Sequence, residues 1–296
     1  MPQSAITVIG LGSMGMGMAR ILVGAGFEVY GQDISEDRLA AFEAAGGKRA
    51  PLVEAVAASQ VVVSVVLNAA QTEAVLDLCA PQMAQGAVFV SCATVPPDFA
   101  RQMAEKAEAA GLLYLDAPIS GGAVGAGTGT LSIMASGAPA AFDVAMPALE
   151  AMSKVVYRLG DMAGAGSAMK AVNQLLAGVH LTAMGEALNF AASQGLDLGK
   201  VTEIITNSAG NSWMFENRAP HVVENDYAPR SMVDIWPKDL GIVCDIATSG
   251  KVPVPMTEVA LRQYRKASEA GDGAIDDAAI TRVYARACGV KLPGDD

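Results

Sequence analysis

The feature that most constrains this chain is a glycine-rich turn near its start, between an apolar run and a helical pattern. Ile6–Ile9 has the β-branched character of a buried strand, and GLGSMG follows it directly at residues 10–15. Gly10 permits a tight turn, Gly12 lets a ligand approach the backbone, and Gly15 lets the helix lie close to the strand. The GxGxxG spacing in this context predicts a dinucleotide-binding βαβ unit, with a glycine-rich turn that binds nothing as the alternative.

Asp33 indicates which dinucleotide would bind. It ends a second apolar run, residues 27–32, at the distance from the glycines where such units carry an acid. A carboxylate there can accept from both hydroxyls of an adenosine ribose and repels the 2′-phosphate of NADP, so we predict NAD. Asp33 could instead cap the helix expected near residue 35. The predicted contacts to the cofactor in this region are Gly10, Leu11, Gly12, Ser13, Met14, Gly15 and Asp33.

Composition narrows the class of protein. The chain has 296 residues, 52% hydrophobic and 17% charged, which suits one large or two ordinary globular domains. A formal net charge of -11 without a Lys/Arg cluster argues against nucleic acid or an anionic membrane as partner. The start of the chain lacks a secretory signal pattern, and the four cysteines lack metal-ligand spacing. We therefore expect a cytoplasmic protein without a metal site.

Strand and helix patterns alternate through the first half of the chain. Val61–Val66 is apolar at all positions but one, as in a strand covered on both faces. Further strands are expected at 87–92, 112–116, 130–135 and 154–159, and helices at 36–45, 51–58, 71–79, 97–110 and 139–152. This pattern predicts a Rossmann-type, doubly wound parallel sheet, an α/β fold, over residues 1–163.

Polar residues follow several of these expected strands. Leu67, Asn68 and Thr94 stand at the carboxyl edge of the sheet, where open α/β sheets bind ligands, although capping and turn formation are equally open. A second glycine-rich segment, residues 117–129, follows the strand at 112–116 and is expected to be a loop. N–H groups of Ser120, Gly121 and Gly122, with the Ser120 hydroxyl, could form a nest for a carboxylate. A flexible surface loop is the alternative.

The chain changes character after residue 163. A proline-free helical pattern runs to Gly195, with Met169, Val172 and Leu176 among its recurring apolar positions. A helix of this length, about 45 Å, is more than a small domain needs, so it is expected to link two bodies or enter a dimer core. We predict an all-helical domain over residues 164–296, joined to the first by this helix, in a homodimer or homotetramer.

Lys170, Asn173 and Gln174 share one face of that helix. A partly desolvated lysine beside a cationic nicotinamide can have its pKa lowered towards neutrality and accept a proton. A solvated surface lysine is the ordinary alternative. The two histidines, His180 and His221, are expected to be structural, with His221 in a connecting segment.

Four motifs in order carry a family resemblance: GLGSMGMGMA from residue 10, DAPISGGAVGAGTGTL from 116, GSAMKAVN from 166 and PKDL from 237. Together they resemble the β-hydroxyacid dehydrogenases, the group of 3-hydroxyisobutyrate dehydrogenase and tartronate semialdehyde reductase. The resemblance implies NAD-dependent oxidation of a small hydroxy acid, with Lys170 as catalytic acid/base and Asn173 as a substrate amide.

The same resemblance implies further contacts. Ser120, Gly121 and Gly122 would hold the substrate carboxylate, and Asn68, Thr94 and Lys238 would touch the cofactor near the nicotinamide. Many members carry a second asparagine where this chain has Gln174, so its contact with substrate stays open. A related imine reductase is one alternative, although its members generally lack the lysine at this position. A nucleotide-binding protein without catalysis is another.

The segment 207–218 is the expected substrate wall. Asparagine and serine residues surround Trp213 and Phe215, and Trp213 is a predicted substrate contact. Each polar group left unpaired in a closed site costs about 1 to 3 kcal/mol, so this polar richness favours a polyhydroxylated four-carbon acid. A solvated interhelical loop with two core aromatics is the alternative.

Overall fold

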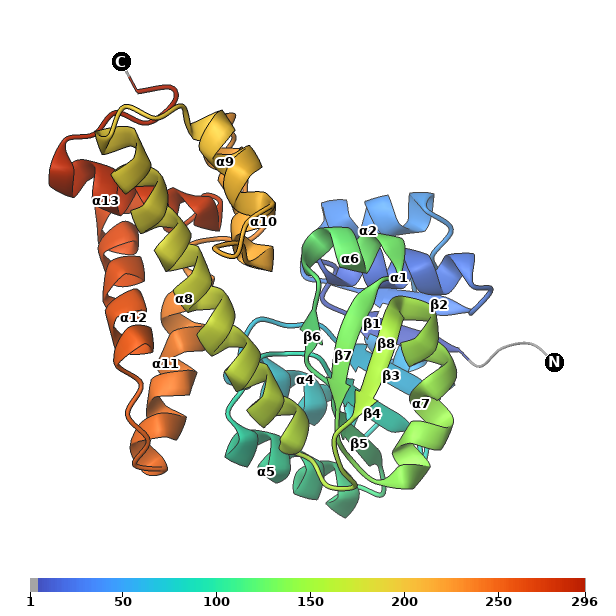
Figure 1. The fold of residues 1–296 in the computed structure, drawn as a ribbon. Helices are drawn as coiled ribbons and strands as arrows, with labels where there is room; N and C mark the ends of the chain where they lie inside the picture. Colours follow the sequence, from blue (N-terminus) through green and yellow to red (C-terminus); the bar gives the residue numbers. More distant parts are fainter. Residues whose placement is uncertain (1–4, 296) are drawn as a thin grey trace. The chain divides into compact units, whose positions relative to one another are not determined.

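Short strands rich in β-branched residues form the centre of the first part of the chain. The computed structural model describes residues 5–295. The strands are β1 (Ile6–Ile9), β2 (Val29–Gln32), β3 (Val61–Ser64), β4 (Val88–Ser91), β5 (Leu113–Asp116), β6 (Ile119–Ser120), β7 (Leu131–Ala135) and β8 (Ser153–Arg158). The first five form one parallel sheet in the order β2-β1-β3-β4-β5 (Figure 1). Every residue of β1, β3 and β4 is buried, as expected of a parallel sheet covered on both faces.

The remaining strands form a second, smaller sheet in the order β6-β7-β8. β6 runs antiparallel to β7, whereas β8 runs parallel to β7. A bridge between Asp116 and Ser136 joins the end of β5 to the residue after β7.

Helices make up most of the rest of the chain. They are α1 (Gly15–Gly24), α2 (Glu36–Ala44), α3 (Leu52–Ala58), α4 (Ala69–Cys79), α5 (Pro97–Ala109), α6 (Gly122–Thr128), α7 (Pro139–Met152), α8 (Ala165–Ser193), α9 (Leu198–Thr206), α10 (Trp213–Val223), α11 (Ile235–Ser249), α12 (Pro255–Ala267) and α13 (Ile280–Cys288), with short turns η1 (Ser268–Asp272) and η2 (Asp277–Ala279). None of the helices within residues 5–295 combines the length and apolarity needed to span a bilayer.

The chain divides into two units, one that ends at Lys170 and one that starts at Ala171, so the boundary lies within the 29-residue helix α8. The core of the first unit includes Met18 and Phe42. The core of the second unit includes Trp236 and Tyr264, whose stacked rings have centroids 5.4 Å apart. A Rossmann-type sheet followed by an all-helical region confirms the predicted fold class.

Residues 117–129, expected as a loop, contain β6 and the helix α6. Three of the seven residues of α6 are glycine, which lowers intrinsic helix propensity. Packing on α1 compensates: a Cβ added at Gly17 would lie 2.8 Å from the carbonyl carbon of Ala126, so the two backbones nearly touch. The loop prediction was wrong because tertiary packing outweighs propensity here.

His221 was also misplaced by the sequence. It lies inside α10 with Pro220, which sits in the last turns of that helix, and not in a connecting segment. Pro220 has no N–H to donate to the carbonyl of Glu216, so α10 lacks one helical hydrogen bond at this point.

The apolar positions that predicted α8 do not all face the core. Met169, Val172 and Leu176 are 42%, 50% and 49% exposed. The buried positions of this helix segment include Ser167 and Gln174 instead.

Candidate active site

The parallel sheet gathers several predicted cofactor residues of the first unit at one edge. Carboxyl ends of parallel strands lie on the same side, and here Gly10 follows β1, Asp33 follows β2, Asn68 comes after β3 and Thr94 after β4. Leu67 precedes Asn68 and is half exposed. Residues separated by more than 80 positions therefore meet at the edge where open α/β sheets bind ligands.

The glycine-rich turn has one open position among its three glycines. Gly10 has a φ of +93°, and a Cβ there would lie 2.4 Å from the carbonyl oxygen of Val65. A Cβ on Gly15 would lie 1.8 Å from the carbonyl oxygen of Gly10, whereas nothing lies within 4 Å of a Cβ on Gly12. Helix α1 starts at Gly15 with no acid in its first turn. Open space before a helix N-terminus fits the pyrophosphate of a dinucleotide.

Asp33 holds the glycine-rich turn to the start of α2. Its Oδ2 accepts a hydrogen bond from Leu11 N at 2.7 Å, and its Oδ1 accepts from Ser35 N at 2.9 Å. Ser35, not Asp33, is the N-cap of α2. Oδ1 has a second lone pair, so Asp33 keeps acceptor capacity for a ribose hydroxyl. Arg38 lies beside it, with Nη1 3.5 Å from Oδ2.

Asn68 performs the capping role that the sequence left open. Its Oδ1 accepts from Gln71 N at 2.9 Å at the start of α4, and Leu67 N donates to Gln71 Oε1 at 2.9 Å. Thr94 lies in the bend between β4 and α5 and is half-buried. A contact between these side chains and the cofactor stays a prediction.

Ser120 and the two glycines after it form a tight turn between β6 and α6. Ser120 pairs with Ser132 of β7. Gly121 and Gly122 have φ values of +130° and +64°, a conformation that other residues rarely adopt. The half-buried Ser120 therefore stands at a chain reversal with backbone N–H groups nearby, as a carboxylate nest requires.

Asp116 is a buried carboxylate that the sequence analysis did not single out. Its Oδ2 accepts from Gly164 N at 2.9 Å and from Ser167 N at 2.8 Å, and its Oδ1 accepts from the Ser167 hydroxyl at 2.6 Å. Burial raises the pKa of this carboxyl, and the hydrogen bonds from Ser167, Gly164 and Ser136 oppose that rise. An acid that ends an apolar strand was the available signal. Asp116 fixes the start of α8, one turn before Lys170, which is 7% exposed.

The predicted residues of the second unit lie on three helices. Asn173 and Gln174 are on α8, Trp213 is the first residue of α10, and Lys238 is in the first turn of α11. Asn173 and Gln174 hydrogen bond to each other, and Gln174 also contacts Asp239, the neighbour of Lys238. Trp213 is 57% exposed. No grouping of His, Cys, Asp and Glu that could hold a metal ion occurs among residues 5–295.

The polar residues of segment 207–218 mostly bond to their own helix ends. Asn207 Nδ2 donates to Glu203 O, Ser208 Oγ to Ile204 O and Asn211 Nδ2 to Thr206 O, while Ser212 Oγ accepts from Phe215 N. These bonds are those of helix caps and turns. Local structure therefore explains the composition of this segment, and a contact between it and a polyhydroxylated substrate stays a prediction.

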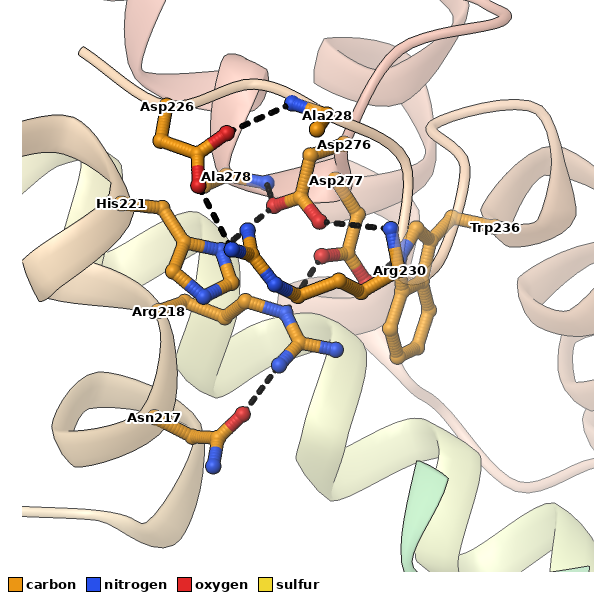
Figure 2. Close-up of polar contacts among 10 residues, drawn as sticks. All are labelled: Asn217, Arg218, His221, Asp226, Ala228, Arg230, Trp236, Asp276, Asp277 and Ala278. Atoms are coloured by element: carbon orange, nitrogen blue, oxygen red, sulfur yellow. Dashed lines mark hydrogen bonds and ion pairs between the residues drawn. The ribbon is translucent and has the colours of Figure 1, made fainter. Parts of the chain in front are cut away.

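Arg218, the last residue of that segment, belongs to a buried polar cluster (Figure 2). Its Nε donates to Asp277 Oδ1 at 2.7 Å, and Trp236 Nε1 donates to Asp277 Oδ2 at 3.0 Å. Burial raises the pKa of Asp277 and the Arg218 guanidinium opposes the rise. His221 Nδ1 lies 2.9 Å from Asp276 Oδ1. Arg218 therefore joins α10 to η2, and Asp277 of η2 in turn joins α11 through Trp236.

Comparison with known proteins places the chain in a family. The protein family described as the NAD binding domain of 6-phosphogluconate dehydrogenase matches residues 5–160. A second protein family, described as NAD-binding of NADP-dependent 3-hydroxyisobutyrate dehydrogenase, matches residues 164–284. The chain belongs to the β-hydroxyacid dehydrogenases. This confirms the family predicted from the four motifs, and the prediction of an oxidoreductase with a NAD-binding Rossmann domain.

Individual β-hydroxyacid dehydrogenases resemble the chain over nearly its full length. It is 45% identical over 293 residues to the L-threonate dehydrogenase of Cupriavidus necator, covering 98% of each chain. It is 41% identical to that of Escherichia coli K12, over 98% of this chain and 96% of the relative. A crystal structure of 3-hydroxyisobutyrate dehydrogenase from Salmonella typhimurium superimposes with a TM-score of 0.91 at 42% identity, covering 95% of this chain and 100% of that one.

Proposed function

We propose that this protein oxidises L-threonate at C2 to the 2-oxo acid, with NAD as hydride acceptor. The observation that carries the substrate assignment is the similarity to L-threonate dehydrogenases, which extends over 98% of the chain at 45% identity. The segments that begin at Asn173, Ser212 and Val233 share that resemblance. The open space at Gly12 and the carboxylate of Asp33 support the choice of NAD.

In the proposed reaction Lys170 takes the proton of the C2 hydroxyl. NAD, when bound, supplies the acceptor for the hydride that leaves C2, so the hydroxyl carbon becomes a ketone. Lys170 stands one turn into α8, where the hydrogen bonds that Gly164 N and Ser167 N donate to Asp116 hold the backbone that carries it. A group held by such a support can keep its position through the proton transfer.

The turn at Ser120, Gly121 and Gly122 would bind the substrate carboxylate. The positive φ values at both glycines support this role, because a turn of the backbone can direct successive N–H groups to one anion. Asn173, three residues after Lys170 on α8, would contact the substrate, and Lys238 and Thr94 would contact the cofactor. These roles follow from the family resemblance.

A substrate panel tests the proposal. We would measure kcat/KM with NAD for L-threonate, D-erythronate, D-glycerate and 3-hydroxyisobutyrate, and with NADH for tartronate semialdehyde. We expect the highest value for L-threonate. A larger kcat/KM for 3-hydroxyisobutyrate than for every polyhydroxy acid would exclude the substrate and favour the activity named for the Salmonella structure.

We also propose that the protein is a homo-oligomer in the cytoplasm. The support for an oligomer is the exposed apolar stripe Met169, Val172 and Leu176 on α8. Leu176→Lys would place a charge in that stripe and should reduce the mass measured by light scattering. An unchanged mass above that of a single chain would show that other residues form the interface. Cell fractionation tests the location.

A further inference from the structure

A chain of four polar side chains joins α8 to α11 inside the second unit. Asn173 Nδ2 donates to Gln174 Oε1 at 2.9 Å, and Gln174 Nε2 donates to Asp239 Oδ2 at 2.6 Å. Lys238 Nζ lies 2.6 Å from the other carboxylate oxygen, Oδ1. Gln174 is 7% and Asp239 2% exposed. Buried polar groups of this kind hold fixed positions because leaving one unpaired is costly.

The carboxylate of Asp239 determines which way each amide in this row of side chains must point. An ionised carboxylate can only accept hydrogen bonds, so Gln174 must turn its NH2 group to Asp239 and its carbonyl oxygen away from it. That oxygen also can only accept, so Asn173 must turn its own NH2 group to Gln174. The Oδ1 of Asn173 then points away from Gln174. The two amide orientations follow from the chemistry of Asp239 and not from an arbitrary choice of rotamer.

Gln174 reaches the carboxylate of Asp239 because its side chain is one methylene longer than that of asparagine. On the same face of α8, Gly178 lets α11 approach closely, since a Cβ there would lie 2.8 Å from Cδ2 of Leu240. The spacing of the two helices is therefore set one turn beyond Gln174. An asparagine at position 174 would withdraw its amide by about 1.5 Å, one carbon–carbon bond, and the 2.6 Å contact to Asp239 would exceed hydrogen-bond length.

We propose that Gln174 and Asp239 are positioning residues that fix the amide of Asn173, so that its Oδ1 is a constant acceptor for a substrate hydroxyl. This inference rests on the proposed function, in which Asn173 touches the substrate. An oriented acceptor favours a hydroxyl over a methyl group or a carboxylate, because neither of these can donate a hydrogen bond. Gln174 and Asp239 would thus select acids that carry a hydroxyl besides the one that is oxidised.

The test compares L-threonate with analogues that lack one further hydroxyl, 2,4-dihydroxybutanoate and 2,3-dihydroxybutanoate. We would measure the ratio of kcat/KM for L-threonate to that of each analogue in the wild type, in Asp239→Asn and in Gln174→Met. Asp239→Asn keeps the shape but can donate as well as accept, so it no longer sets the direction. Gln174→Met keeps the side-chain length and leaves Lys238 beside Asp239. Asp245→Asn, exposed on the same helix, is the matched control.

In both variants we expect the larger of the two wild-type ratios to fall about 3- to 10-fold, the effect of losing one oriented hydrogen bond, with the control unchanged. Affinity for NAD and the thermal midpoint show that each variant is folded. If kcat/KM falls equally for all three acids, the hydrogen bonds among these four side chains have only a structural role and the inference is wrong. A wild type that prefers 3-hydroxyisobutyrate contradicts the proposed function instead, and is seen before any variant is made.

Discussion

Asp116 and Ser167 are joined by two hydrogen bonds, one from the serine hydroxyl to Oδ1 at 2.6 Å and one from its backbone N to Oδ2 at 2.8 Å. The carboxylate ends β5 and the serine lies in the first turn of α8. A negative group at a helix N-terminus satisfies N–H groups that have no partner within the helix. The pair therefore sets where α8 begins, and with it the position of Lys170 three residues later.

Removing this carboxylate should destabilise the fold of the first unit. Asp116→Ala leaves two buried N–H donors, of Gly164 and Ser167, without an acceptor, so the free energy of unfolding should fall by roughly 2 to 6 kcal/mol. Asp116→Asn can keep its oxygen on these donors and should cost less. Urea denaturation measures both. Asp143→Ala, on the exposed side of α7, is the control.

The pH dependence of stability gives a second measure of Asp116. Burial raises its pKa above the ordinary 3.8, so this carboxyl binds a proton more tightly in the folded state than in the unfolded chain. The stability from this group is complete below about pH 3.8 and is lost as the pH rises through the folded-state pKa. The unfolding free energy of the wild type, relative to Asp116→Asn, should therefore decrease from pH 4 upwards. An increase would contradict the raised pKa.

Lys170→Ala should abolish the chemical step and leave cofactor binding nearly intact, because the lysine is expected to handle the hydroxyl proton and not the pyrophosphate. We expect kcat to fall on the order of 10² to 10⁴. Steady-state kinetics and titration with NAD measure the two effects. Lys200→Ala, on the surface of α9, should change neither. High residual kcat with an unchanged pH profile would exclude Lys170 as the acid/base.

Gly12→Ala should separate binding from folding. Nothing in the protein lies within 4 Å of the added Cβ, so the thermal midpoint should stay close to that of the wild type. The same Cβ would enter the space expected for the pyrophosphate, so affinity for NAD should fall at least about tenfold. Gly24→Ala, equally free of neighbours at the other end of α1, should bind NAD normally. Unchanged affinity in Gly12→Ala would place the pyrophosphate elsewhere.

Asp33→Ser should weaken NAD and admit NADP, with a shift in preference of at most a few kcal/mol. Arg38 lies 3.5 Å from the carboxylate and could pair with a 2′-phosphate once the acid is gone. We therefore expect Asp33→Ser combined with Arg38→Ala to lose the gain in NADP affinity. Kinetics with both cofactors decide the matter. A wild type that already prefers NADP would contradict the role assigned to Asp33.

Features encoded by neighbouring residues could be predicted from the sequence. The βαβ unit and the long helix α8 follow from glycine spacing and apolar periodicity within short windows. Contacts between distant positions could not: Asp116 and Ser167 are 51 residues apart, and Gln174 and Asp239 are 65 apart. Nothing in the local pattern around any of the four indicates its partner.

Some local patterns also had two physical explanations. The serines and asparagines of segment 207–218 resembled a polar pocket, but the same residue types cap helices, and the structure uses them so. The glycines of α6 indicated a loop, but close packing against the backbone of α1 stabilises a helix there. Composition limits what such segments can do, and the neighbouring element decides between the possibilities.

The contact between Gly17 and Ala126 also links two places in the first unit. Helix α1 starts directly after the turn at residues 10–15, and α6 starts directly after Ser120 and Gly121. Because backbone lies directly against backbone at this contact, a shift of one turn is expected to be passed to the other. If dinucleotide and acid bind at these two turns, their affinities are expected to be reciprocally coupled, each ligand changing the dissociation constant of the other by the same factor.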